Sequence, residues 1–343
     1  MIRVLGLLAT IPLFTACQHA EATDHDHDVP RRAMLDPTAA LLDPIQIDSL
    51  TLTPMVAPMT PVPIEEPDVL TLDEGFAQKV VGITEQGSVN NLTLTNKDQR
   101  PLFLLAGEVI IGGKQDRIIG QNTVIPGNTT QSVPVFCVEH GRWGGSSDVF
   151  TSGQALAHGR LRGKASFETQ QAVWNEVAEK NAARGTSNAT GTYRDVATTQ
   201  SDGTLAKSET RIAQALAKVD AGERARMIGY VIAVNGTIAT VDRFTSPRLF
   251  RKLENKLVRS YLTESIDVTA AKDIKAPTVA DVKTFMADAD KATQEPSYEN
   301  AAASTVRYLG DKAGKAQVEL KPYRLKSGKP GKAGKMFETY QAK

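Results

Sequence analysis

Residues 101–143 read PLFLLAGEVIIGGKQDRIIGQNTVIPGNTTQSVPVFCVEHGRW, and this stretch decides the fold. Short apolar runs rich in Val, Ile and Leu are separated here by Gly, Pro and Asn, a pattern typical of consecutive strands joined by turns. Half-buried strands usually alternate apolar with neutral polar residues. These strands instead carry residues with reactive or charged side chains, which indicates a candidate site: Glu108, Gln115, Arg117, Cys137, Glu139, Arg142 and Trp143.

Strand signals continue on both sides of this stretch. Ile45 begins an alternating segment, residues 88–96 alternate again, and late strands are expected near residues 304–309, 317–321 and 336–340. Many short strands at such spacing predict an antiparallel sandwich or an open barrel.

Helical patterns lie mostly in the second half of the chain. Residues 166–184, 205–219, 247–262 and 278–291 carry apolar residues at helical spacing, and Ser246-Pro247 is a helix start signal. Residues 228–242 predict a β-hairpin closed by Asn235-Gly236. The predicted fold class is therefore α+β, a β-sandwich-like N-terminal half with helices and a β-hairpin packed on it.

The amino terminus has the layout of an export signal. Arg3 supplies a positive start, and a short apolar run ends at Leu13-Phe14-Thr15-Ala16-Cys17, which resembles a bacterial lipobox. Cys17 would then be the lipidated residue, and Gln18 after it favours the outer membrane by analogy with such lipoproteins. We therefore expect a cell-envelope protein, lipid-anchored at the outer membrane and facing the periplasm, with the membrane as a partner.

This layout divides the chain into three parts. Residues 1–17 are the expected signal peptide, residues 18–44 a flexible tether, and residues 45–341 the folded domain. The domain is expected to be strand-rich over 45–150, helix-rich over 165–300, and to end with late strands over 302–341. The polar stretch 142–164 is expected to be a long loop that could flank a site.

Composition narrows the function classes. A net charge of +1 with 23% charged residues argues against nucleic acid as a partner, and 6% aromatic residues argue against a broad stacking platform. No Gly-rich phosphate loop, GxSxG, HExxH or CxxC motif is present, so no cofactor is predicted. The run DHDHD at residues 24–28 contains metal-binding side chains but imposes no geometry, and no metal is assigned.

Cys137 would be a lone thiol in an oxidising compartment once Cys17 is acylated. Such a thiol is either buried and inert or used as a nucleophile. On one strand Cys137 and Glu139 point to the same face and His140 to the other. A Cys–His pair therefore requires the strand to end or bulge after Glu139.

The carboxylates admit two interpretations. Glu108, inside an apolar run, needs a partner, which Arg117 or Lys114 on the next strand could supply. Alternatively Glu108 and Glu139 are acid/base groups, with Gln115 and Arg117 as ligand donors. Arg142, Trp143 and Asp242 complete the candidate ligand-binding set, although Asp242 could equally cap the helix that follows it.

Two blocks of sequence carry a family resemblance. The first contains Gly107-Glu108, the segment 113–117 (GKQDR), the segment 135–139 (VFCVE) and Gly141-Arg142-Trp143; the second contains residues 229–236 (GYVIAVNG) and 256–261 (KLVRSY). Together they resemble the ARG and rhodanese-phosphatase superfamily-associated protein domain over roughly residues 45–340. The family takes its name from an association with ADP-ribosylglycohydrolases and phosphatases. The resemblance thus implies a link to ADP-ribose-like or phosphorylated substrates without naming a reaction.

The sequence is compatible with three functions. The first is a lipid-anchored module for ligand binding or interaction, with a polar site on its β-sheet for a small polar or anionic ligand. The second is a hydrolase acting on an ADP-ribose-like or phosphorylated substrate through Cys137 or through Glu108 and Glu139. A third, a purely structural envelope protein, follows if Glu108 and Arg117 are fully paired without a cavity beside them.

Overall fold

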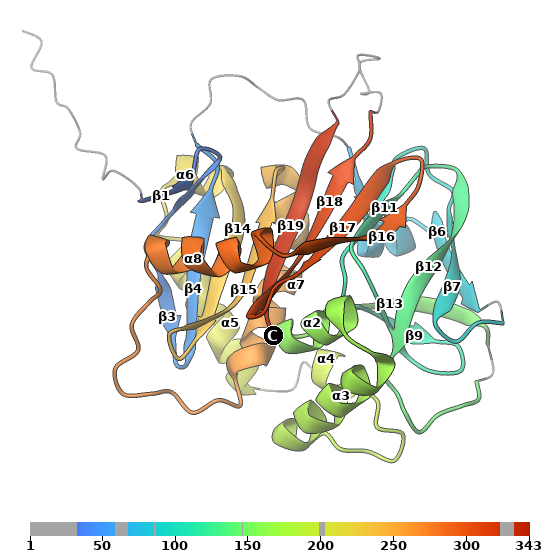
Figure 1. The fold of residues 1–343 in the computed structure, drawn as a ribbon. Coiled ribbons are helices and arrows are strands. Elements are labelled where there is room, and N and C mark those ends of the chain that lie inside the picture. Colours follow the sequence, from blue (N-terminus) through green and yellow to red (C-terminus); the bar gives the residue numbers. More distant parts are fainter. Residues whose placement is uncertain (1–32, 59–67, 86, 146, 199–202, 323–332) are drawn as a thin grey trace, which may run out of the picture. The chain divides into compact units, whose positions relative to one another are not determined.

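The computed structural model describes residues 33–58, 68–85, 87–145, 147–198, 203–322 and 333–343 (Figure 1). Within these ranges the chain combines helices with mostly antiparallel sheets, so the predicted α+β class is confirmed. In the same ranges, no helix is both long enough and apolar enough to span a bilayer. Cys17 and the run at residues 24–28 lie outside the described residues.

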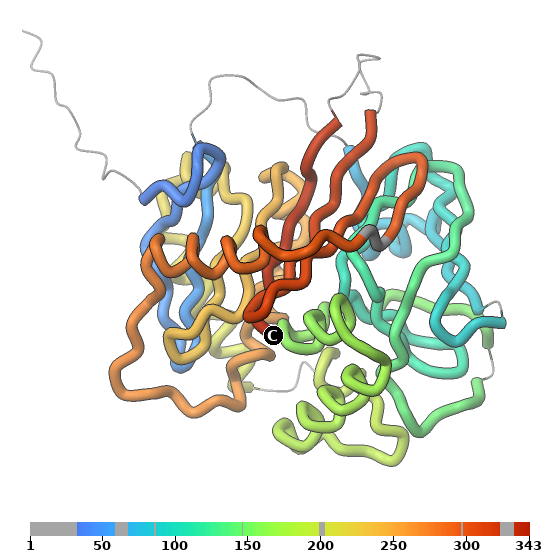
Figure 2. Tube along the Cα trace, viewed as in Figure 1, coloured from blue at the N-terminus to red at the C-terminus, as the bar shows by residue number. Residues whose placement is uncertain are grey.

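A ten-stranded antiparallel sheet forms the larger layer, in the order β1-β2-β4-β14-β15-β19-β18-β17-β16, with β3 beside β4. The C-terminal strands lie between the β14–β15 hairpin and the segment of residues 102–137 (Figure 2). The strands of this sheet are β1 (Ala33–Asp36), β2 (Ala39–Leu41), β3 (Ile45–Ile47), β4 (Leu50–Val56), β14 (Met227–Val234), β15 (Thr237–Phe244), β16 (Thr293–Glu299), β17 (Ala303–Leu309), β18 (Ala313–Leu320) and β19 (Gly334–Ala342).

The central strands of this sheet are buried on both faces, which explains their nearly continuous apolar sequences. Every residue of β4 is buried, and in β14 only Val234 is partly exposed. One face packs against the long helix α7 (Pro247–Ser265) and α5 (Gly203–Leu216), and the other against α8 (Val279–Asp290).

A closed barrel forms the second β-structure, in the order β10-β12-β7-β6-β13-β9. Alternate residues of each strand fill its interior, for example Ile83, Leu94, Ile119 and Val135. These six strands close into a barrel, whereas the sequence predicted a sandwich-like N-terminal half. The barrel strands are β6 (Val81–Glu85), β7 (Asn91–Asn96), β9 (Glu108–Gly112), β10 (Arg117–Ile119), β12 (Thr129–Cys137) and β13 (Val149–Leu156).

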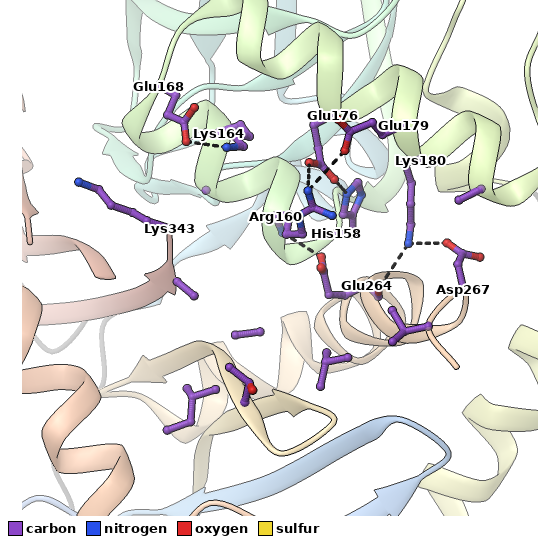
Figure 3. Close-up of a pocket in the computed structure, with 18 of the residues that line it drawn as sticks. His158, Arg160, Lys164, Glu168, Glu176, Glu179, Lys180, Glu264, Asp267 and Lys343 are labelled. Atoms are coloured by element: carbon purple, nitrogen blue, oxygen red, sulfur yellow. Dashed lines mark hydrogen bonds and ion pairs between the residues drawn. The ribbon is translucent and has the colours of Figure 1, made fainter. Parts of the chain in front are cut away.

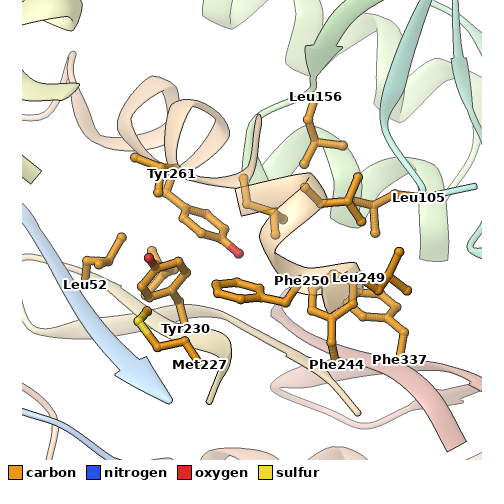
Figure 4. Close-up of a cluster of buried hydrophobic side chains, with 14 of the residues drawn as sticks. Leu52, Leu105, Leu156, Met227, Tyr230, Phe244, Leu249, Phe250, Tyr261 and Phe337 are labelled. Carbon is orange, nitrogen blue, oxygen red and sulfur yellow. The ribbon is translucent and has the colours of Figure 1, made fainter. Parts of the chain in front are cut away.

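A small sheet of β5 (Leu70–Thr71), β8 (Leu102–Leu104) and β11 (Thr123–Ile125) lies beside the barrel. Phe103 of β8 packs edge to face against Phe244 and Phe337 of the large sheet, with ring centroids 6.2 and 5.7 Å apart. These rings belong to the main apolar cluster, which Figure 4 shows between α7 and the sheet. The cluster therefore joins the small sheet to the large sheet, while the barrel interior forms a separate apolar cluster.

The remaining helices are α1 (Leu72–Ala77), α2 (Gly159–Phe167), α3 (Gln170–Arg184), α4 (Arg194–Thr198) and α6 (Ala221–Ala225). Apolar residues of α2, α3 and α4 pack on the outer side of the barrel in a separate cluster.

Several local predictions are confirmed. Asn235 and Gly236, both with positive φ, close the β14–β15 hairpin. Pro247 opens α7 behind the cap of Ser246, whose hydroxyl accepts from the Leu249 N–H. The helix expected over 278–291 forms as α8, capped by Thr278, and the late strand expected near 336–340 forms as β19.

Other local predictions are wrong. Residues 33–41, assigned to the tether, form β1 and β2. The expected loop 142–164 contains β13 and the start of α2, and the single helix expected over 166–184 is interrupted at Glu168, so that Thr169 caps α3. β13 carries Gly and Ser and has a register shift between Ser152 and Leu156, so its sequence lacks a regular strand period.

Candidate functional site

Asp116, in the turn between β9 and β10, is fully buried and accepts several hydrogen bonds. Its Oδ1 accepts from Arg194 at 2.7 Å and from Arg142 at 3.2 Å, and its Oδ2 accepts from the Thr192 hydroxyl at 3.0 Å. The two arginines come from the loop after β12 and from α4. Asp116 therefore ties three segments of the chain together.

Glu139 and Gln115 belong to the same network. Glu139 Oε2 accepts from the Asp116 N–H at 3.0 Å and from Arg142 Nε at 2.8 Å, while Gln115 Nε2 donates to the Glu139 carbonyl at 2.8 Å. Burial favours the protonated acid, but the hydrogen bonds from Arg142 and Asp116 outweigh it and lower the pKa of Glu139. The carboxylate is thus ionised and already held by protein groups.

Arg117 and Cys137 are paired across strands β10 and β12, and strand alternation puts them on the same faces as the interior residues Ile119 and Val135. Arg117 Nη1 donates to the Gln115 carbonyl at 2.7 Å, and its Nη2 lies 3.5 Å from Glu85 Oε1. Cys137 is fully buried, and this burial raises the pKa of its thiol. A buried thiol with a raised pKa is a poor nucleophile.

His140 does not lie with Cys137 in the barrel. The strand β12 ends at Cys137, and the His140 ring packs edge to face on Trp174 of α3, with centroids 4.5 Å apart. The strand end that a Cys–His pair would need is therefore present, but the two side chains lie in different environments.

Glu108 finds its partner far along the chain. Its Oε1 lies 2.8 Å from Lys256 Nζ of α7, which also pairs with Asp73 at 2.6 Å, and its Oε2 accepts from the Leu105 N–H at 2.9 Å. Burial raises the pKa of Glu108, and Lys256 opposes this shift. The prediction that Arg117 or Lys114 on the neighbouring strand pairs with Glu108 is therefore wrong.

Asp242 pairs with Arg162 in the interior between α2, α7 and the large sheet. Two guanidinium nitrogens donate to its carboxylate at 2.7 and 3.1 Å, and the Tyr261 hydroxyl donates at 2.6 Å. All three side chains are at most 1% exposed. Asp242 is thus neither a helix cap nor an accessible site residue.

The predicted residues fall into three separate buried groups instead of one accessible site on the sheet. Arg142 is partly exposed, and Trp143 is exposed by 60%. The rest are at most 4% exposed and engaged by protein partners: Glu108, Gln115, Arg117, Cys137, Glu139 and Asp242. A ligand does not reach them in this conformation. Their burial reflects the charge pairs that they form across the fold, which local sequence does not reveal.

A pocket of about 630 Å³ lies elsewhere, between α2 and α3 on one side and the β14–β15 turn and the end of α7 on the other (Figure 3). Its walls combine apolar residues such as Phe167, Ile238 and Val268 with charged residues such as Arg160, Lys180 and Glu264. A concave site with apolar walls and a few placed polar groups is the usual form of a small-molecule site.

His158 holds an acidic residue at the pocket wall. Its Nε2 lies 2.8 Å from Glu176 Oε1 and its Nδ1 2.7 Å from the Tyr193 hydroxyl, which also accepts from the His158 N–H at 3.1 Å. Every group is satisfied when Tyr193 donates to Nδ1 and Nε2–H donates to Glu176. Both ring nitrogens are then occupied, so His158 positions Glu176 and offers no free nitrogen to a ligand.

Ion pairs hold the cations of the pocket. Arg160 Nη2 lies 3.1 Å from Glu176 Oε2, and its side chain is 59% exposed. Burial alone favours the protonated acid, but the bond from His158 and the charge of Arg160 lower the pKa of Glu176. Lys180 lies 2.6 Å from Asp267 and donates to the Glu264 carbonyl.

Glu264 closes the N-terminus of α2. His158 provides no side-chain cap there, and Glu264 Oε2 accepts from the Arg160 N–H at 2.8 Å. Among the described residues, no cation lies within ion-pair distance of this carboxylate. It is the acidic group of the pocket with the least compensated charge.

Sequence reasoning missed these residues. His158, Arg160 and Lys164 fall within or at the end of the expected loop 142–164, although that loop was expected to flank a site. Glu176 and Lys180, one helical turn apart, were the available signal, since they place opposite charges on one face of a predicted helix.

Comparison with known proteins gives one match. No curated protein and no solved structure matches the chain. The model of the ARG and Rhodanese-Phosphatase-superfamily-associated Protein domain matches residues 38–326, which includes the buried network around Asp116 and the pocket helices α2 and α3. The chain therefore belongs to the ARG and Rhodanese-Phosphatase-superfamily-associated Protein domain family.

Proposed function

We propose that this protein is a ligand-binding module of the cell envelope, anchored through lipid on Cys17, and that it binds a small polar ligand in the pocket between α2, α3 and the end of α7. The pocket itself carries the proposal. Its volume of about 630 Å³ lies within the usual range for small-molecule sites.

The charged wall of the pocket is preorganised. Glu176 is held by His158 and Arg160, and Asp267 by Lys180 and by Arg184 at 3.1 Å. Groups fixed before binding lose little conformational entropy when a ligand arrives, which favours affinity for a polar ligand.

The hydrolase alternative has less support. Cys137 is fully buried with a raised thiol pKa, and the carboxylates of Glu108 and Glu139 are bound by protein groups. Neither arrangement places a nucleophile or a general base beside the pocket.

A thermal-shift screen of small polar compounds tests the proposal. Ala183 is an exposed residue of α3 that lines the pocket, whereas its neighbour Ala182 is exposed and does not line it. Ala183→Trp should fill the pocket and abolish the shift of any true ligand, and the matched variant Ala182→Trp should preserve it. A screen without any compound that raises the Tm, or hits that survive Ala183→Trp, would instead favour a structural role.

A further inference from the structure

We infer that the ligand is a small zwitterion, with an ammonium group at one end and a carboxylate or phosphate at the other. This inference rests on the proposed function, since it names the ligand class of the same pocket. Its basis is the uneven distribution of charge along the pocket wall.

One end of the pocket is acidic. Arg160 and Lys180 stand against Glu176, Glu179, Glu264 and Asp267, a net charge of −2, which Arg184 reduces to −1 by pairing with Asp267 from outside the pocket. Lys180 and Asp267 lie on the opposite side of the pocket from Lys164 and Lys343 in Figure 3.

Glu264 is the group at this end that a ligand cation would bind. Within the described part of the chain its Oε2 accepts only the Arg160 N–H, whereas Glu176, Glu179 and Asp267 each have a cation within ion-pair distance. An ammonium group with three donors would satisfy the remaining capacity of this carboxylate.

The other end is cationic. The side chains of Lys164 and Lys343 stand against that of Glu168, so these three side chains sum to +1. The Lys164–Glu168 pair is 30% and 39% exposed, and exposed pairs of adjacent helical turns are weak. A ligand anion can therefore recruit Lys164 without breaking a strong interaction.

Apolar residues line the same pocket as the charged groups. Phe167, Ile238 and Val268 line the pocket with hydrocarbon surface, and Val268 is 40% exposed. A zwitterion whose charges are separated by methylene groups would match a pocket wall that carries acidic, apolar and cationic side chains.

Calorimetric titration with ω-amino acids of increasing length, from glycine to 6-aminohexanoate, tests the inference. Hexanoate and hexylamine serve as matched probes with a single charge, and phosphoethanolamine tests phosphate in place of carboxylate. We expect at least one zwitterion to bind more than tenfold tighter than either single-charge probe of matched length.

Two variants assign the ends. Glu264→Gln keeps an oxygen that accepts the Arg160 N–H, so α2 remains capped, and it should remove the advantage of the zwitterion over the matched anion. Lys164→Met should instead remove its advantage over the matched amine. Glu299→Gln, at an exposed pair with Lys321 on β16, is the control and should change neither.

The outcomes separate this inference from the proposed function. Hexanoate binding as tightly as 6-aminohexanoate, or full discrimination in Glu264→Gln, overturns the zwitterion while leaving a ligand-binding pocket. If no zwitterion binds, the zwitterion inference is overturned as well. The proposed function is then tested separately by the thermal-shift screen, in which Ala183→Trp should abolish the shift of a true ligand. Unchanged melting of Glu264→Gln without ligand verifies that the variant is folded.

Discussion

The buried ion pairs show what individual charged residues do in this fold. Arg162 and Asp242 are both fully buried and are joined by hydrogen bonds of 2.7 and 3.1 Å, with Tyr261 as a third partner. Removing one partner of such a pair leaves an uncompensated charge in the interior. This lowers the free energy of unfolding by far more than the intact pair contributes to it.

Arg162→Met should therefore lower the free energy of unfolding by about 3–5 kcal/mol, because Asp242 is left without its cation. Arg160→Met is the matched control two residues earlier on α2. Its guanidinium is 59% exposed, so the expected loss is at most about 1 kcal/mol. Urea unfolding followed by circular dichroism measures both values. Equal losses in the two variants would contradict the assignment of Arg162 to the core.

Cys137 provides a second test at this scale. In the folded protein its thiol should react with a disulfide reagent near neutral pH only as fast as the chain opens, because it is fully buried and its pKa is raised. Both labelling rates are measured in a Cys17→Ser variant, so that Cys137 is the only thiol. The rate for the chain unfolded in urea is the reference for a fully accessible thiol. Rapid labelling of the folded protein would restore Cys137 as a candidate nucleophile.

Among the structural elements, α2 depends on how closely the chain can pack around Arg162. Gly107 separates β8 from β9 with a φ of +90°, and a Cβ there would lie 2.5 Å from Cγ of Arg162. The glycine thus permits both an unusual backbone conformation and the approach of α2 to the barrel.

Gly107→Ala should destabilise the protein by about 2 kcal/mol or more, because backbone strain and overpacking act together. Gly82→Ala in β6 is the control, since a Cβ there meets no atom within 4 Å. It should change stability by less than about 0.5 kcal/mol. The two stabilities are compared by their midpoints of urea unfolding. If Gly107→Ala were no less stable than Gly82→Ala, α2 would have to be able to shift away from position 107.

The contact between α2 and α3 predicts a pH dependence. The folded-state pKa of Glu176 lies below its ordinary value of 4.5, so the unfolded chain binds more protons between the two values. The stability that Glu176 contributes is present above pH 4.5 and is lost as the pH falls through the folded pKa. Glu176→Gln should lie below the wild type in stability at pH 6, and the gap should shrink below pH 4.5. A gap that stays constant in urea titrations from pH 6 to pH 3 would be inconsistent with this shift.

Local signals determined which elements could be predicted. The β14–β15 turn and the start of α7 follow from Asn235-Gly236 and Ser246-Pro247, whose conformational preferences act over a few residues. β13 depends on pairing with β6 and β9 on either side, and its own sequence has no regular period. Tertiary contacts therefore override its weak local preference.

For the whole molecule, residue types were easier to predict than partners. The charged residues of 101–143 were recognised as unusual, and Glu139 and Arg142 do meet at Asp116, whereas Glu108 lies apart with Lys256. Their long-range partners, such as Lys256 for Glu108 and Arg194 for Asp116, come from other elements and were not predictable from strand spacing. The pocket was missed for the same reason, because its walls come from α2, α3, α7 and the β14–β15 turn.

The lipid anchor is the prediction that concerns the entire chain, because the compartment in which the chain is anchored determines which ligands can reach the pocket. In a bacterial host, the full-length protein should incorporate a labelled fatty acid, and Cys17→Ala should abolish the label, since thioether and amide acylation both require this cysteine. Cys137→Ala is the matched control and should leave the label unchanged, because Cys137 is buried in the folded domain and lies far from Cys17 in the sequence. Fatty-acid labelling followed by gel fluorescence measures all three. A label that persists in Cys17→Ala would remove the basis for an envelope location, whereas the pocket and its ligand would stand on their own tests.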